Sequence, residues 1–233
     1  MLVNTLWAQE TSHTNIWSRI AISKSINSKL KVETEFQKRW QNDITSNSNN
    51  PFDYKLMTSV RLWTYYQMND KFTFIISPFA YYENNPIIKK ESDKTKICSY
   101  ENRYTVAFEF NQKVYNGLKL QSRTGIEYRD FKNTSPDYFR LREKLSLKYN
   151  FNTKFALTGY DEVFFNATNS EGLHNFDQNR LGLSLNYNFI KELKLEIGFI
   201  KIERSQKNST EHLSENDIVL NCYYTLPNKK IKK

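Results

Sequence analysis

The chain has 233 residues, of which 39% are hydrophobic and 15% aromatic, and its formal net charge is +9. This length suits a single domain, and the aromatic content excludes a disordered chain. No run of about 18 apolar residues occurs, which excludes a transmembrane helix but not a transmembrane barrel, whose strands need only about ten alternating residues. Basic residues are spread along the whole chain without a helix-turn-helix, zinc-finger or RNA-recognition motif, so nucleic acid is not an expected partner.

Alternating apolar and polar residues predict eleven strands, because successive side chains of a strand point to opposite faces. Pro78 cannot donate a ladder hydrogen bond and therefore predicts a bulge or a locally open edge in the fourth strand. The expected strands cover about residues 17–23, 30–40, 54–66, 72–82, 100–110, 118–129, 139–149, 155–165, 180–187, 193–199 and 218–226.

The connections between these strands alternate in length. Tight turns fall near residues 27, 69, 116, 152 and 191. Transmembrane barrels show this asymmetry, with short periplasmic turns and long external loops. The long polar loops cover about residues 41–52, 83–96, 131–137, 166–174 and 205–216.

The strand number bears on how a barrel could close. Eleven strands cannot close by antiparallel pairing alone, because both end strands then run in the same direction. We expect an all-β, antiparallel up-and-down transmembrane β-barrel of twelve strands, with residues 2–12 supplying one more, and ten strands as the alternative. Residues 15–227 form its single domain. Residues 1–14 are expected as a signal-peptide remnant or an ordinary N-terminal segment, and residues 228–233 as a polar tail.

Residues 118–129 show most clearly that the two strand faces differ in chemistry. Leu118 and Ile126 share one face, whereas Arg123 and Glu127 share the other. Ion pairs and water can satisfy a charged face inside a closed barrel, but lipid cannot, so we expect the apolar face outside. The charged residues expected in the lumen are Glu33, Glu35, Arg39, Arg61, Glu101, Arg103, Glu109, Arg123, Glu127, Arg129, Arg140, Arg142, Arg180 and Glu196.

These inward side chains are long, and a barrel of ten or twelve strands is only somewhat wider than the eight-stranded barrels that side chains fill. Bidentate pairs of arginine with carboxylate would hold them across the lumen. We therefore expect a largely occluded lumen that passes at most water or small ions. The surplus of basic groups predicts a mild preference for anions.

Aromatic residues fall near strand ends rather than strand centres, as expected for girdles at the two membrane interfaces. Glu143 breaks the alternation beside Leu141 and Leu145, so a bulge near Arg142, or a position at the headgroup level, is expected there. The candidate girdle residues are Trp40, Trp63, Tyr65, Tyr66, Tyr81, Tyr82, Tyr149, Tyr187, Tyr223 and Tyr224.

The histidines and cysteines give no sign of a metal centre. His13, His174 and His212 fall in expected loops or near the terminus and lack metal-ligand spacing. We expect surface histidines, no metal and no cofactor. Cys98 and Cys222 allow one disulfide or two free thiols.

Carboxylates are the remaining catalytic candidates. Asp161, Glu162 and Asp177 could perform acid–base chemistry near a barrel mouth if their pKa values were split by environment. Pairing with lumen arginines is the favoured interpretation. No catalytic constellation is identified, and the protein is expected not to be an enzyme.

Several short motifs are similar to those of a known family. They are Trp17, Glu35-x-x-x-Arg39, the Arg-x-x-x-x-Tyr-Arg of Arg123 to Arg129, Arg140-Leu-Arg142, Asp161-Glu-Val-Phe-Phe-Asn166 and Phe176-Asp-Gln-Asn-Arg180. With these motifs the chain resembles the uncharacterised outer-membrane barrels of Bacteroidota and other Gram-negative bacteria that are catalogued as domain of unknown function 2490. The resemblance covers about residues 17–226 and implies an outer-membrane location, contact with lipid and lipopolysaccharide, and no assigned activity.

The sequence leaves three functions open. The first is an integral outer-membrane barrel with a charge-paired lumen, serving as a structural or surface component or as a narrow, porin-like pore. The second is a soluble lipocalin-like binding barrel, in which the apolar face would point inward. The third is a barrel enzyme acting on envelope lipid or glycan.

Overall fold

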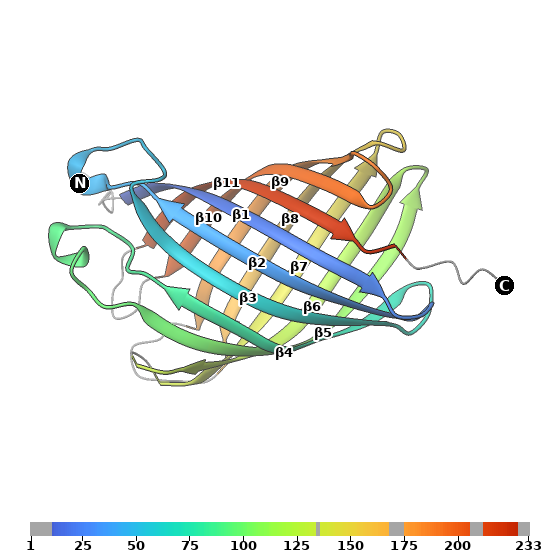
Figure 1. The fold of residues 1–233 in the computed structure, drawn as a ribbon, viewed down its shortest axis with the longest axis horizontal. Helices are drawn as coiled ribbons and strands as arrows, with labels where there is room; N and C mark the ends of the chain where they lie inside the picture. The colour runs from blue at the N-terminus through green and yellow to red at the C-terminus, as the bar shows by residue number, and fades with distance from the viewer. Residues whose placement is uncertain (1–10, 134–135, 168–174, 206–211, 228–233) are drawn as a thin grey trace, which may run out of the picture.

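The computed structural model describes residues 11–133, 136–167, 175–205 and 212–227, and these form one closed β-barrel (Figure 1). Each strand pairs with its neighbours in the chain, and β1 also pairs with β11. The strands are β1 (Thr11–Ser25), β2 (Leu30–Gln41), β3 (Tyr54–Gln67), β4 (Phe72–Asn84), β5 (Ser99–Tyr115), β6 (Leu118–Phe131), β7 (Tyr138–Asn150), β8 (Phe155–Asn166), β9 (Phe176–Asn188), β10 (Leu193–Ser205) and β11 (His212–Thr225).

The described residues thus confirm an all-β, mostly antiparallel barrel, with eleven strands rather than twelve or ten. The difference lies in the closure, because β1 and β11 run parallel from the Thr11↔Leu213 pair to the Ser23↔Thr225 pair. A parallel seam lets an odd number of strands close, and no further strand is needed. β1 already begins at Thr11, ahead of the expected barrel start at residue 15, whereas residues 1–10 and 228–233 lie outside the described part of the chain.

The apolar strand face lies outside the barrel and the charged face lies inside. Leu145, Leu183 and Ile197 are about half exposed on the outer wall, at 51%, 54% and 55%. Glu127 and Glu101, on the opposite face, are buried. An apolar interior of the lipocalin kind is therefore wrong for this chain.

A bulge in β4 re-aims part of that strand. The register with β3 and with β5 shifts around Pro78, as expected from its missing N–H. Because an extra residue reverses the alternation, Ala80 and Tyr82 turn into the lumen instead of continuing the outer face, and both are buried.

Glu143, in contrast, causes no bulge. β7 keeps an unbroken register with β6 and β8 through this position, so Glu143 stays on the outer wall opposite Thr124. Its carboxylate accepts hydrogen bonds from the hydroxyls of Ser122, at 2.7 Å, and Thr124. Two neighbouring hydroxyls on β6 thus replace the expected change in backbone.

Short turns gather at one end of the barrel and long loops at the other, which confirms the predicted asymmetry (Figure 1). Three turns share one pattern: an apolar residue, Asn, any residue, Lys and a second apolar residue, over residues 26–30, 68–72 and 151–155. In each, the Asn side-chain oxygen accepts the backbone N–H groups of the Lys and the following residue at 2.8–2.9 Å. The pattern sets Lys29, Lys71 and Lys154, the rim lysines, at equivalent positions.

At the long-loop end, two 3-10 turns, η1 (Ile44–Ser46) and η2 (Glu91–Asp93), are tied together. The Lys94 ammonium lies 2.8 Å from Asp43 and 2.7 Å from Glu91, and the Thr45 hydroxyl bonds Glu91 at 2.5 Å. Hydrogen bonds from Lys94 and Thr45 lower the pKa of Asp43, and the carboxylates of Asp43 and Glu91 raise the pKa of Lys94.

None of the helices in the described part of the chain has the length and apolar character needed to span a membrane.

Candidate functional site

A buried cluster centred on Glu127 of β6, the Glu127 cluster, lies inside the lumen. The Glu127 carboxylate lies 2.6 Å from Arg140 of β7, 3.6 Å from Arg61 of β3 and 3.9 Å from Arg103 of β5. Alternation turns all four side chains inward, and closure of the barrel brings together strands that are distant in sequence. A single carboxylate therefore holds three arginines across the lumen.

A second carboxylate, Glu101 of β5, extends this cluster toward the long-loop end. It accepts hydrogen bonds from Arg129 at 2.8 and 2.9 Å, from Asn84 at 3.0 Å and from Arg103. Arg140 continues to Asp177 of β9 at 2.7 Å. Charge-assisted hydrogen bonds of this kind are about twice as strong as neutral ones, so the cluster is a fixed structural element of the lumen.

Beside the Glu127 cluster lies an arginine–aromatic layer made of Trp17, Arg39, Phe164 and Arg180. The Arg39 guanidinium stacks 3.3 Å from the Trp17 ring centroid, and Arg180 lies 4.5 Å from that of Phe164. Glu162 anchors the layer through Arg180 at 3.8 Å and also pairs with Arg142 at 2.6 Å. Stacked rings and guanidinium groups fill space that ion pairs alone would leave open.

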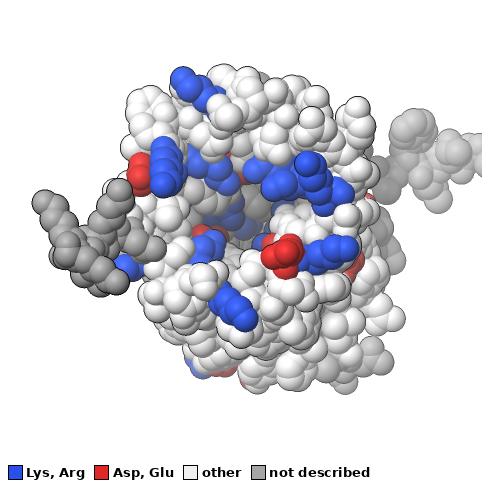
Figure 2. All heavy atoms as spheres, turned by 90° about the vertical axis from the view of Figure 1, so that its right-hand side faces the viewer, with Lys and Arg blue, Asp and Glu red and all other residues white. Residues whose placement is uncertain are grey.

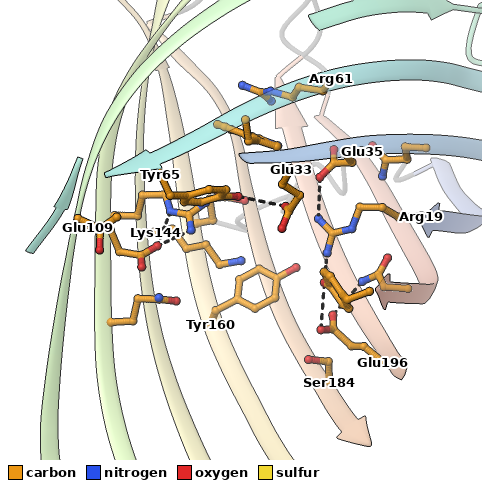
Figure 3. A pocket seen from close by; sticks show the side chains of 18 of the residues that line it. Arg19, Glu33, Glu35, Arg61, Tyr65, Glu109, Lys144, Tyr160, Ser184 and Glu196 are labelled. Atoms are coloured by element: carbon orange, nitrogen blue, oxygen red, sulfur yellow. Dashed lines mark hydrogen bonds and ion pairs between the residues drawn. The ribbon is translucent and has the colours of Figure 1, made fainter. Parts of the chain in front are cut away.

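On the short-turn side of this layer the lumen widens into a cavity of about 690 Å³, the vestibule (Figure 3). Ser25, Asn27 and Lys29 line its mouth, so it opens at the short-turn end. Figure 2 faces that end and shows a hollow with Lys and Arg side chains around and within it. The lumen thus holds a buried polar cluster at one level and a cavity at another.

Ion pairs and hydrogen bonds also line the vestibule wall. Arg19 lies 3.3 Å from Glu35 and donates to the Tyr223 hydroxyl, and Arg123 pairs with Glu109 (Figure 3). The remaining wall carboxylates bind their own neighbours: Glu33 accepts from Lys31 at 3.1 Å and Tyr65 at 3.2 Å, and Glu196 from Asn221 at 2.9 Å and Tyr223 at 3.3 Å.

Every one of the fourteen predicted lumen residues lies on the inward face, and ion pairs join all of them except Arg39 and Glu196 within the described chain. The predicted network omitted Arg19, although alternation places this residue on the inward face. Glu162 and Asp177 pair with lumen arginines, as the favoured interpretation of the candidate catalytic carboxylates expected. Four expected girdle residues, Trp63, Tyr65, Tyr82 and Tyr223, line the vestibule instead. Their closeness to strand ends did not reveal which face they occupy.

The parallel seam between β1 and β11 carries its own buried polar group. Asn15 donates to Glu215 at 2.9 Å and to Asp217 at 2.7 Å, and Arg204 pairs with Glu215 at 2.9 Å. His13 lies on β1 at 1% exposure, so its expected surface position is wrong. His212 begins β11, and His174 lies outside the described residues.

The candidate catalytic carboxylates do not converge. Glu162 and Asp177 are held by lumen arginines, whereas Asp161 faces outward and accepts a hydrogen bond from Asn179 at 2.5 Å. Alternation separates Asp161 from its neighbour Glu162 by the barrel wall. No group of three or more His, Cys, Asp or Glu side chains in the described ranges could hold a metal ion, and Cys98 and Cys222 are free thiols.

A family model and solved structures are similar to this chain. The family model described as "Protein of unknown function (DUF2490)" matches residues 14–213, and the chain belongs to this family. No curated protein matches it. The barrel is similar to the NanC porin in a rhombohedral crystal form, with a TM-score of 0.53 and 11% identity over 92% of this chain and 98% of that one. A bacterial polysaccharide outer membrane secretin gives a TM-score of 0.48 and 7% identity over 82% of this chain and 63% of that one.

Proposed function

We propose that this member of the DUF2490 family is an integral outer-membrane barrel with an occluded lumen, serving as a structural or surface component or as a narrow pore. The observation that carries the proposal is the placement of chemistry on the two faces of the wall. Large apolar side chains such as Leu181 (61% exposed) and Phe108 (52% exposed) cover the outside, and arginines and carboxylates fill the inside. Exposure of this apolar outer wall to water would be unfavourable, whereas the acyl chains of lipid solvate it.

The dimensions of the strands support a membrane position. The shortest strands, such as β2, have 12 residues. At about 3.3 Å per residue and a tilt of about 40°, 12 residues rise roughly 30 Å along the barrel axis, more than the roughly 25 Å apolar band of outer-membrane barrels. Tyr66, Tyr149 and Tyr224 lie outward near the short-turn end, where rings at the lipid–water interface would be expected.

The packing of the lumen argues against a general diffusion pore. Arg61 and Arg140 are 3% and 5% exposed, so water has little access to the Glu127 cluster. A solute moving along the axis would have to break ion pairs in this cluster or displace the arginine–aromatic layer. Permeation is therefore limited to water or small ions, with a mild preference for anions because basic groups outnumber acidic ones in the chain, 34 to 25.

Orientation follows from the loops, since short turns face the periplasm in outer-membrane barrels. The vestibule then opens to the periplasm, and the long loops with η1 and η2 face outside, toward lipopolysaccharide. Outer-membrane lipid contacts the apolar wall. These two are the partners expected from the geometry.

Planar-bilayer recording on purified, detergent-refolded protein tests the proposal. We expect insertion into lipid with conductance far below that of a general porin. Arg140→Ala removes an arginine of the Glu127 cluster and is expected to raise conductance or lower thermal stability. The same outcome is expected for Arg123→Ala in the vestibule wall. Lys38→Ala, on the outer face beside Trp40, serves as the control and should change neither. A large stable conductance in the unaltered protein would refute occlusion, and a chain that stays folded and soluble without detergent would refute the membrane position.

A further inference from the structure

The vestibule is strongly basic. Twelve basic and five acidic side chains line it, among 40 lining residues. Several of the basic groups are neutralised by carboxylates, including Arg19 by Glu35 and Arg123 by Glu109. Within the described residues, four of the lining cations form no ion pair: Lys29, Arg39, Lys144 and Lys194.

Several hydrogen-bond donors on the vestibule wall have no acceptor in the described part of the chain, those of Lys144, Lys194 and Tyr160 among them. Within the described residues, Lys144 of β7 and Lys194 of β10 form no ion pair, and the hydroxyl of Tyr160 on β8 forms no hydrogen bond. The Lys144 ammonium lies 3.6 Å from the centroid of the Tyr160 ring, and Lys194 lies 3.8 Å from that of Tyr223. Figure 3 shows Lys144 and Tyr160 together inside the cavity.

The nearest carboxylates are already engaged elsewhere. Glu162, the register partner of Lys144, gives one oxygen to Arg142 at 2.6 Å and the other to Arg180 at 3.8 Å. Glu196, two residues from Lys194 on the same face, gives its oxygens to Asn221 and Tyr223. Stacking on a ring recovers part of the energy of each ammonium but leaves its N–H donors free to bind an anion.

A glycine keeps this wall open to the tyrosine. Gly182 of β9 faces inward beneath Tyr160, and a Cβ atom there would overlap the ring. Tyr160 also packs against the apolar cluster of Trp17 and Ile200, which fixes its position. The donors of Lys144 and Tyr160 are thus held on a rigid wall rather than on a mobile loop.

We propose that the vestibule binds small, water-soluble oxyanions, carboxylate- or phosphate-bearing solutes, at Lys144 with the Tyr160 hydroxyl and at Lys194. This deepens the proposed function by naming the ligand class of its periplasmic opening. The barrel wall separates the site from lipid headgroups, so the ligand is a free solute. The rim lysines Lys29, Lys71 and Lys154 raise the local concentration of anions at the mouth.

Equilibrium titration of the refolded barrel in neutral detergent tests this proposal, with citrate and inorganic phosphate as probes and glucose as the uncharged control. Calorimetry gives affinity, and the fluorescence of Trp17 and Trp63, which line the vestibule, reports occupancy. We expect saturable binding of at least one anion and none of glucose. Citrate and phosphate in separate titrations tell the carboxylate preference from the phosphate preference.

The Lys144→Gln/Lys194→Gln double variant should weaken binding at least tenfold. Lys38→Gln is the matched control, because this lysine also stacks on a ring, at 5.0 Å from Trp40, but on the outer face. Tyr160→Phe should weaken binding without loss of fold. Absence of saturable binding, or equal losses in the double variant and the Lys38 control, would overturn the site. Gel migration before and after heating and insertion into lipid are measured on the same samples. They show whether the barrel is folded and enters a membrane, so that a failure to bind anions is distinguished from a failure of the membrane proposal.

Discussion

Neutralising one carboxylate should expose how much the barrel depends on its buried charges. Glu127→Gln keeps the size of the side chain but removes the negative charge that faces Arg61, Arg103 and Arg140. Arg103 retains Glu101 and Arg140 retains Asp177, whereas Arg61 loses its one carboxylate partner among the described residues. Three guanidinium groups would then lie together in the Glu127 cluster with less negative charge to balance them.

The size of the effect can be worked from burial. Glu127 is 1% exposed, and removing one partner of a buried ion pair costs about 3–5 kcal/mol. For a chain of 233 residues, about 1 kcal/mol shifts the melting temperature by roughly 2–4 °C, so the expected fall is about 6–20 °C. Glu109→Gln is the matched control, because Glu109 forms one ion pair in the described part of the chain, with Arg123, and lines the vestibule. The loss of stability should be smaller than for Glu127→Gln, because one arginine rather than three loses a counter-charge.

The assay is the unfolding temperature of refolded protein in one detergent, followed by the migration of heated samples on gels and by circular dichroism. Glu127→Gln/Arg61→Gln should recover part of the loss, because it removes the uncompensated arginine. Equal falls for Glu127→Gln and Glu109→Gln would refute the view that the Glu127 cluster holds the lumen together. A double variant less stable than the sum of its parts would refute the assignment of Arg61 as the stranded charge.

Three further outcomes follow from local geometry. Gly182→Ala should lower the free energy of unfolding by about 1–3 kcal/mol, measured by chemical denaturation. Gly159→Ala, on the open outer wall, is the control and should change little. Equal effects of the two substitutions would contradict the close approach of Tyr160 to Gly182. Asn15→Asp adds a third carboxylate at the seam and should lower the free energy of unfolding by about 3 kcal/mol or more. Asn216→Asp, at an exposed position, is the control and should have a smaller effect. An Asn15→Asp protein as stable as the unaltered one would argue against the seam contact. The lowered pKa of Asp43 means that its contribution is present above the unfolded value of about 4 and is lost as pH falls through the lower folded pKa. The Thr45 amide should therefore be protected from hydrogen exchange equally at pH 5 and pH 8, and this protection should be lost below about pH 4. In the Asp43→Asn variant the same amide should already lack this protection at pH 7.

Much of the barrel could be predicted from residues alone. Alternation with a period of two assigned Arg123, Glu127 and Arg140 to the lumen and Leu145 and Leu183 to the outer wall, because which face a side chain takes is a local property of an extended strand. The alternation of short turns and long loops was equally local, since Asn-containing turns and polar loops are set by their own sequences. The bulge at Pro78 could be predicted for the same reason, but its consequence for Tyr82 could not, because one extra residue reverses every later position in the strand.

The tertiary structure alone decided which charges meet. Arg61 and Glu127 lie on β3 and β6, and their pairing depends on the stagger of strands around the closed barrel, which no single strand encodes. The parallel seam between β1 and β11 was hidden for the same reason, because the two ends of the chain meet only when the sheet closes. The free ammonium groups of Lys144 and Lys194 became visible only once Glu162 and Glu196 were found bound to other partners. The sequence determined the face of the side chains wherever the alternation is unbroken, and closure of the barrel, a non-local event, determined their partners.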